Sequence, residues 1–353
     1  MVRPARLHVT RLPLLNSVLG SLPVFTDTSS PELDHALSTL RSKHFVPAYL
    51  NKRQRNLIFK DKFKTELENT PSYATLGEEE IPLEHIDRTR DIPARVPLLQ
   101  QTVDLMQAPE DWKQLPAILE GLHKAKAAVK TSFLEKTVRK AIQAGQLRTV
   151  LACLQKANAT GLSLRNERIL RLVIWGLHQE AQTESWDQEH LKKALQYANN
   201  VAQLLEQAQH GTGRTVLPND PRTDPAVIGV YLELAAVNAW KYQDKKDTDG
   251  SVMKYAERLM SCFENYQPPV QQDVSQRGPQ TEMLTKLPVW HGLRLAKAIL
   301  GRNMPNSQQA QSIVQEYEAR LSELADALDN GAAPKPNTYA EQVLGAWNGC
   351  ISD

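Results

Sequence analysis

Helical periodicity between residues 131 and 177 narrows the possible folds more than any other feature of the sequence. In its middle, apolar side chains recur at i, i+3, i+4 and i+7: Leu147, Val150, Leu151 and Leu154. That spacing places them on one face of a helix. Gly145 and Gly161 flank this helix, and a glycine in the left-handed conformation ends a helix and lets the chain reverse. Residues 169–177 are apolar almost all round, which indicates a helix buried on every side.

The same period of three to four residues recurs through much of the remaining chain. It predicts helices over 31–41, 110–129, 187–209, 225–242, 252–266, 282–300 and 307–329, then a short final segment. No stretch sustains the alternation of a half-buried strand, so no significant sheet is expected. The hydrophobic fraction of 41% suffices for a real core. The predicted fold class is therefore all-α, a degenerate α-solenoid whose body repeats helical hairpins.

Proline and charge divide the chain into four predicted parts. These are a targeting-like or disordered segment (1–30), a basic helical extension (31–69), an extended acidic and proline-rich connector (70–97) and a helical-repeat domain (98–353). Ser30 followed by Pro31 favours a helix start at the head of the extension. Four prolines within the connector argue for an extended, ordered path. Hydrogen bonds from its Asp and Arg side chains are expected to pin it.

The strongest functional signal is the charge of residues 41–64. They hold eight basic residues against one acid, Asp61, and residues 1–64 contain eleven Lys and Arg against four Asp and Glu. Asn51 is predicted to cap a helix that starts at Lys52. Clustered cations bind a phosphate backbone by releasing its counterions. The predicted nucleic-acid-binding residues are Arg41, Lys43, Lys52, Arg53, Arg55, Lys60, Lys62 and Lys64.

Aromatic side chains are interleaved with these cations, and a second interpretation stays open beside nucleic-acid binding. Tyr49, Phe59 and Phe63 are candidates to stack on exposed bases. Residues 66–91 contain eight acids, however. A basic helix that pairs with the protein's own carboxylates, or is simply solvated, fits the same pattern.

The first 26 residues resemble a mitochondrial targeting segment. They contain Arg3, Arg6 and Arg11 and no acid, which is typical of import into mitochondria. An ordinary disordered tail is the alternative. The expected localisation is the mitochondrial matrix, and no apolar run is long enough to span a membrane.

Motifs for catalysis, cofactors and metals are not recognisable in the chain. The nine histidines are scattered without metal-ligand spacing, and no nucleophile elbow or dinucleotide fingerprint occurs. Cys153 lies in an apolar helix and is predicted to be a free buried thiol. The glycines at 211 and 213 lie in a predicted flexible loop, 210–225, because no phosphate-loop lysine follows them. We therefore expect no enzyme, no catalytic residue, no metal site, no cofactor and no small-molecule substrate, although a site assembled from distant residues stays possible.

Two resemblances refine the predicted function. The segment AIQAGQLRTVLACLQKANATGLSL, within residues 131–165, resembles a pentatricopeptide repeat. Only one unit matches, so the resemblance implies the helical-repeat architecture and no base-reading code. An irregular helical bundle with one repeat-like hairpin is the alternative architecture.

The order of an Arg-rich start, LNKRQRNLIFKDKFK, LGEEEIPLEHIDRTRDIP and degenerate helical repeats resembles accessory proteins of the fungal mitochondrial ribosome. The resemblance implies a non-catalytic ribosomal component, with the large subunit favoured. It implies contact with ribosomal RNA through the basic extension and with mitochondrial ribosomal proteins through the helical body. The alternative is a mitochondrial translation factor or a respiratory-complex assembly factor on a helical-repeat scaffold.

Overall fold

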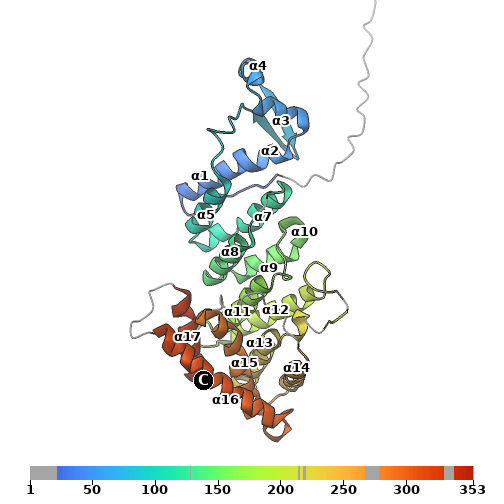
Figure 1. Ribbon diagram of the computed structural model, residues 1–353, viewed down its shortest axis with the longest axis vertical. Helices are drawn as coiled ribbons and strands as arrows, with labels where there is room; N and C mark the ends of the chain where they lie inside the picture. The colour runs from blue at the N-terminus through green and yellow to red at the C-terminus, as the bar shows by residue number, and fades with distance from the viewer. Residues whose placement is uncertain are drawn as a thin grey trace, which may run out of the picture.

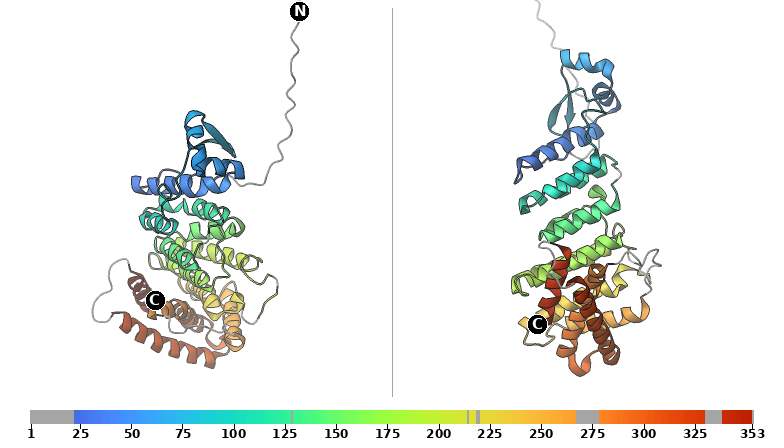
Figure 2. Two further views of the ribbon diagram at one scale, coloured as in Figure 1. Left: turned by 45° about the horizontal axis from the view of Figure 1, so that its top comes forward. Right: turned by 60° about the vertical axis from the view of Figure 1, so that its left-hand side comes forward.

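The computed structural model is mostly helical, which confirms the predicted all-α fold class. It describes residues 22–127, 129–213, 215–217, 220–266, 278–329 and 338–352. The predicted targeting segment, as far as residue 21, and most of the loop 267–281 lie outside these residues. The molecule is elongated, with its helices stacked in successive layers along the long axis (Figure 1; Figure 2, right).

The N-terminal unit, residues 22–91, is built from short helices and one hairpin. Its elements are α1 (Pro31–Thr39), the π-helix η1 (Leu40–Phe45), α2 (Val46–Tyr49), α3 (Lys52–Phe59), the 3-10 turn η2 (Asp61–Phe63), α4 (Lys64–Asn69), β1 (Ser72–Leu76) and β2 (Glu79–Leu83). The first helix starts as predicted, because Ser30 accepts a hydrogen bond from the Leu33 amide and Pro31 follows it.

One local expectation for this unit is wrong. The helix predicted to end near residue 41 continues through η1 and α2 to Tyr49. The connector also forms a two-stranded antiparallel sheet, in which Ser72 pairs with Leu83 and Leu76 with Glu79. Burial alternates along both strands, with Ala74 and Leu83 buried and Leu76 and Ile81 half-buried. The polar Ser72 and Glu79 occupy inward positions and Tyr73 is exposed, which obscures this alternation in the sequence. The turn between the two strands uses Gly77 at φ +69°.

The helical body follows as stacked antiparallel helices. They are α5 (Arg95–Leu105), α6 (Pro109–Trp112), α7 (Leu115–Lys124), α8 (Thr131–Gln143), α9 (Leu147–Gln155), α10 (Ala157–Thr160), α11 (Glu167–Gln182), α12 (Gln188–Leu205), η3 (Pro221–Thr223), α13 (Pro225–Tyr242), α14 (Ser251–Asn265), α15 (Pro279–Leu300), η5 (Gly301–Asn303), α16 (Ser307–Asp329) and α17 (Tyr339–Ser352). The helix predicted over 110–129 is divided between α6 and α7, because Pro116 begins a new helix there.

The centre of the body confirms the predicted hairpin and its buried neighbour. Gly145 and Gly161 both adopt positive φ, +69° and +71°, beside α8, α9 and α10. Apolar side chains of α11 are buried on nearly every side, as are those of α13. Helices α11, α13 and α15 pack against one another and form the core of the C-terminal half.

The loop between α12 and α13 is anchored at both described ends. The buried His210 accepts from the Leu164 amide at its Nδ1 and donates from its Nε2 to the Leu154 carbonyl. Near the other end, Arg258 on α14 donates a hydrogen bond to the Arg222 carbonyl at 3.0 Å. These contacts tie the loop, expected to be flexible, to the body.

Candidate nucleic-acid interface

Helix α3 carries the centre of the predicted basic segment, and its start is capped as predicted. Asn51 Oδ1 accepts from the Gln54 amide at 2.9 Å, and Gln54 Oε1 accepts from the Asn51 amide at 3.1 Å. This reciprocal capping box satisfies two backbone donors that a helix start leaves unpaired. Ile58 anchors the other side of the helix in the core. The cations are therefore presented on a fixed helix.

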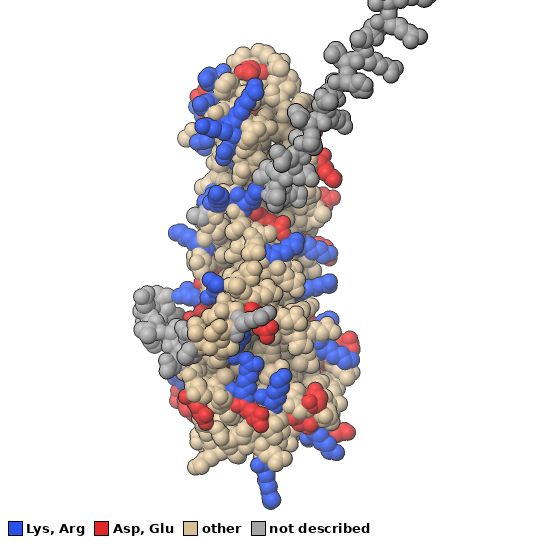
Figure 3. All heavy atoms as spheres, turned by 90° about the vertical axis from the view of Figure 1, so that its right-hand side faces the viewer, with Lys and Arg blue, Asp and Glu red and all other residues tan. Residues whose placement is uncertain are grey.

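Six of the eight predicted cations are exposed, and they are here called the basic surface. It consists of Lys52, Arg53, Arg55, Lys60, Lys62 and Lys64, which are all exposed. None of these side chains makes an ion pair within the part of the chain that the structure describes. On the face that Figure 3 shows, Lys and Arg gather at this end of the molecule, whereas side chains of both charges are interspersed over the body.

Arg41 and Lys43 lie apart from this basic surface. The Arg41 guanidinium pairs with the Glu79 carboxylate on β2, and its Nε donates to the Pro23 carbonyl at 2.8 Å. Arg41 thus fastens the hairpin to η1. Lys43 is half-buried on the same π-helix. The interpretation that the cations pair with the protein's own acids therefore holds for Arg41 but not for the basic surface.

The charge of α3 opposes its own helix dipole. Lys52 and Arg53 occupy the first turn, and no acid shares that turn with them. Cations near the positive end of a helix cost roughly 0.3–1 kcal/mol each at low salt. Nearby acids have other partners, since Asp61 lies 3.4 Å from His85 and Asp87 3.8 Å from Arg90. An arrangement that is unfavourable within the protein is suited to a polyanion outside it.

The interleaved aromatic residues do not form the free stacking surface that the sequence suggested. Tyr49 is buried in the core. The Phe59 ring is half-buried and lies under the Arg88 guanidinium, whose central carbon is 4.2 Å from the ring centroid. Phe63 has the Lys62 ammonium 4.6 Å from its centroid. These rings lie on the inner, apolar side of the segment. The charge pattern of the sequence did not indicate this orientation.

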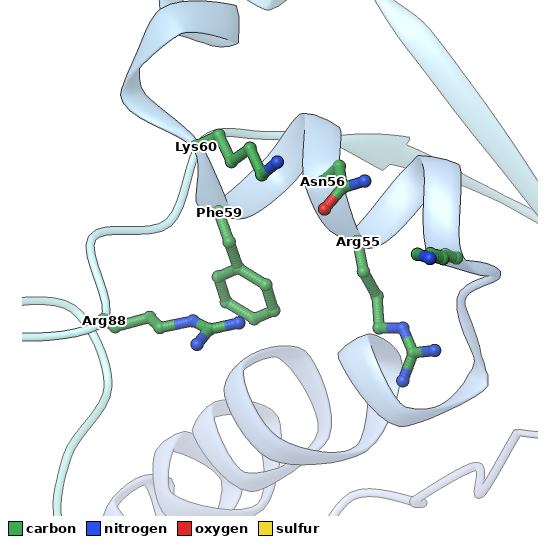
Figure 4. Close-up of a pocket in the computed structure, with 6 residues that line it drawn as sticks. Arg55, Asn56, Phe59, Lys60 and Arg88 are labelled. Atoms are coloured by element: carbon green, nitrogen blue, oxygen red, sulfur yellow. The ribbon is translucent and has the colours of Figure 1, made fainter.

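One face of α3 lines a hollow of about 400 Å³, here called the basic pocket. Its residues are Lys52, Arg55, Asn56 and Phe59 from α3, Lys60 directly after the helix, and Arg88 from the connector. The α3 residues recur at i, i+3, i+4 and i+7, so they share one helix face. Figure 4 shows Arg88 reaching toward Phe59 from the neighbouring loop. Asn56 and Arg88 were not among the predicted site residues.

Helical spacing could have identified Asn56, but no local signal indicates Arg88. Arg88 is held beside α3 because the nearby Ile86 amide donates to the Ile58 carbonyl at 2.7 Å. Asp87 then forms a turn by accepting from the Thr89 amide and hydroxyl, both at 2.8 Å. These hydrogen bonds lower the pKa of Asp87. They order this turn of the connector.

Among the residues that the structure describes, potential metal ligands come together at two other places. His178, Glu233 and Cys350 are buried with ligand atoms within 4.8 Å of one another, as are those of the more exposed Glu184, Asp187 and His190. In the buried group His178 already donates to Glu233 at 2.8 Å, so the contacts are those of a structural network. Cys153 is buried as predicted, and burial raises the pKa of its thiol to about 12, which makes it unreactive.

Comparison with known proteins identifies the family. A family model described as Mitochondrial ribosomal protein mS27 matches residues 14–349. The chain belongs to the mitochondrial ribosomal protein mS27 family. This membership confirms the predicted resemblance to mitochondrial ribosomal proteins and the localisation in the mitochondrial matrix. None of the described helices is both long and apolar enough to cross a membrane.

A fungal member of the mS27 family corrects one expectation. The small ribosomal subunit protein mS27 of Neurospora crassa is 28% identical over 256 residues, which covers 68% of this chain and 64% of the relative. The chain thus spans less than two thirds of that relative's length. The relative's name specifies the small subunit, so the expectation of the large subunit is wrong. A basic extension on a helical body does not distinguish the subunits, because RNA in both presents the same phosphate backbone.

Proposed function

We propose that this chain is a non-catalytic structural component of the small subunit of the mitochondrial ribosome. Its basic surface contacts ribosomal RNA, and its helical body contacts neighbouring ribosomal proteins. The family and the name of the Neurospora crassa relative support the assembly. The observation that carries the RNA contact is the basic surface itself, whose exposed cations make no ion pair among the described residues.

The physical argument rests on counterion release. Each phosphate neutralised by Lys or Arg frees condensed cations, which makes the affinity steeply dependent on salt. Ion pairs within the protein would cancel this gain, because the carboxylates would compete with phosphate. No cation of the basic surface forms such an ion pair within the described structure, whereas Arg41 does. Lys64 does line a hollow with carboxylates, among them Asp61 and Glu68. The contact is therefore assigned to Lys52, Arg53, Arg55, Lys60, Lys62 and Lys64.

The test is a charge reversal that leaves the fold intact. Lys52→Glu, Arg53→Glu and Arg55→Glu are combined in one variant, and sedimentation of mitochondrial lysate measures the fraction that travels with the small subunit. We expect the variant to move to the top of the gradient at physiological salt. The matched control reverses three exposed cations of the body, Lys193, Lys254 and Arg302, and should remain bound. Equal association of both variants with the small subunit would contradict the proposed RNA contact.

Stoichiometry separates a stable component from a transient factor. A structural component should be present at about one copy per small subunit, and it should remain after washing at moderate salt. A translation or assembly factor would be substoichiometric and would appear mainly on precursors. Quantitative mass spectrometry of purified small subunits makes this measurement.

A further inference from the structure

The basic pocket differs from the rest of the basic surface in its shape and in its chemistry. Cations line a hollow of about 400 Å³ that contains an aromatic ring and an amide but no carboxylate. A helical phosphate backbone needs only exposed cations and has no use for a recess. A recess that combines cations with planar groups is suited to a nucleotide that has left its helix.

Resting on the proposed function, we propose that the basic pocket binds a single unpaired nucleotide of the RNA. The nucleobase stacks on the Arg88 guanidinium, and Lys52, Arg55 and Lys60 hold the flanking phosphates. Stacking of splayed bases on arginine planes is a general mode of single-strand recognition.

Arg88 is oriented in advance for this contact. Its guanidinium lies over the Phe59 ring at 4.2 Å from the centroid, and the Ile86–Ile58 hydrogen bond places the connector there. Its side chain is exposed and makes no ion pair in the described chain. A base that stacks on the open side completes a layered arrangement of ring, guanidinium and base. Because Phe59 already restrains the side chain, less conformational entropy is lost on binding.

Asn56 supplies the polar group that can contact a base edge. It lies one helical turn before Phe59 and Lys60, on the face that lines the basic pocket (Figure 4). Its side chain makes no hydrogen bond to any residue that the structure describes, so both its carbonyl and its amino group are free for a ligand. An amide offers a donor and an acceptor together, which matches the edge of a nucleobase better than a phosphate.

The like-charged lining of the pocket also argues for an anionic occupant. Lys52, Arg55, Lys60 and Arg88 surround one small volume, where their mutual repulsion is unfavourable unless an anion neutralises it. On the other side of the helix end, Asp61 and Asp87 line a different hollow with His85. The acids of the connector therefore lie outside the basic pocket.

The experiment compares two labelled RNA hairpins that differ only in one bulged nucleotide. Fluorescence anisotropy with the purified full-length protein should show about tenfold tighter binding to the bulged hairpin, the effect of one stacked base. Arg88→Lys keeps the charge but removes the planar group, and it should abolish this preference while leaving affinity for the paired hairpin nearly unchanged. Arg88 is exposed, so circular dichroism should show an unaltered fold.

The control is the double variant Lys62→Glu and Lys64→Glu, which changes cations outside the pocket. It should weaken binding to both hairpins equally and keep their ratio. If the wild-type protein binds both hairpins equally, or if Arg88→Lys retains the full preference, the assignment of the pocket is overturned while the RNA contact stands. If the wild-type protein binds neither hairpin, even at low salt, both the pocket and the proposed RNA contact are overturned.

Discussion

Two buried imidazoles share one carboxylate in the middle of the body. His178 Nδ1 and His291 Nδ1 each lie 2.8 Å from a different oxygen of Glu233, and all three side chains are fully buried. An ionised carboxylate only accepts hydrogen bonds, so both Nδ1 atoms carry the proton. Burial by itself raises the pKa of Glu233, but the charge and hydrogen bond of His178, followed by those of His291, lower it to about 2. This network links α11, α13 and α15.

Removing the shared acceptor should be costly. Glu233→Gln keeps the size of the side chain but leaves a buried imidazole N–H without its charged partner, and we expect a loss of about 3–5 kcal/mol in the free energy of unfolding. Urea denaturation followed by circular dichroism measures it. The control Glu189→Gln removes an exposed ion pair with Lys192 and should cost less than about 1 kcal/mol. Similar losses in both variants would show that the buried network contributes little.

Stability should also fall in mild acid. Burial lowers the pKa of His291 despite its hydrogen bond to Glu233, so the unfolded chain binds a proton more readily than the folded one. The free energy of unfolding should therefore be highest above about pH 6.5 and decrease below it, by up to ~1.4 kcal/mol per pH unit for this one proton. Urea denaturation at a series of pH values measures the slope.

The matched variants for this pH dependence are His291→Gln and His35→Gln. The first should make the slope below about pH 6.5 smaller, because the contribution of His291 to the protonation difference between the folded and unfolded chain is removed. His35 is exposed, so its replacement should leave the wild-type slope unchanged. Identical slopes in both variants would contradict a role of His291.

At the scale of elements, glycines set the distance between α13 and α15. A Cβ at Gly292 would lie 2.8 Å from the Glu233 backbone nitrogen and 3.0 Å from its Cα, and one at Gly229 would lie 3.0 Å from the Val289 Cα. Backbone atoms cannot rotate away as side chains can, so the two helices would have to separate. The hydrogen bond between His291 and Glu233 depends on this close packing. His291 directly precedes Gly292 in the chain, and the Glu233 backbone lies against Gly292.

Gly292→Ala should therefore destabilise the protein by roughly 1–3 kcal/mol, the usual cost of overpacking a core. The matched control is Gly345→Ala on α17, where a Cβ would meet nothing within 4 Å. That variant should be neutral or more stable by about 0.5–1 kcal/mol, because alanine favours a helix interior. Thermal unfolding of both variants makes the comparison. A stable Gly292→Ala variant would mean that α13 and α15 can move apart freely.

At the scale of the whole molecule, the layered stacking gives an elongated body (Figure 2). A compact globular domain of 353 residues would have a radius of gyration of about 20 Å. We expect small-angle X-ray scattering to give a larger radius of gyration. A variant that begins at Leu22 should also have a radius of gyration above that of a compact domain. A value of about 20 Å for that variant would contradict the extended stacking.

The division into an extension, a connector and a helical body remains a proposal at this scale. The described N-terminal unit joins the extension to most of the connector, since the Ile86–Ile58 hydrogen bond and the Arg41–Glu79 ion pair cross the predicted boundary at residue 69. We therefore expect residues 22–91 to resist proteolysis as one unit.

Features that arise within a few turns of chain could be predicted from the amino-acid sequence. Helices α13 and α16 begin and end where their periodicity predicted, Asn51 caps α3, and Gly145 and Gly161 end theirs, because caps and amphipathic faces depend on residues three or four positions apart. The contacts between residues distant in the sequence became evident only from the three-dimensional structure. It placed Arg88 on Phe59, paired Arg41 with Glu79, and brought His178 and His291 to one carboxylate. These contacts are set by packing between elements, which no local pattern records.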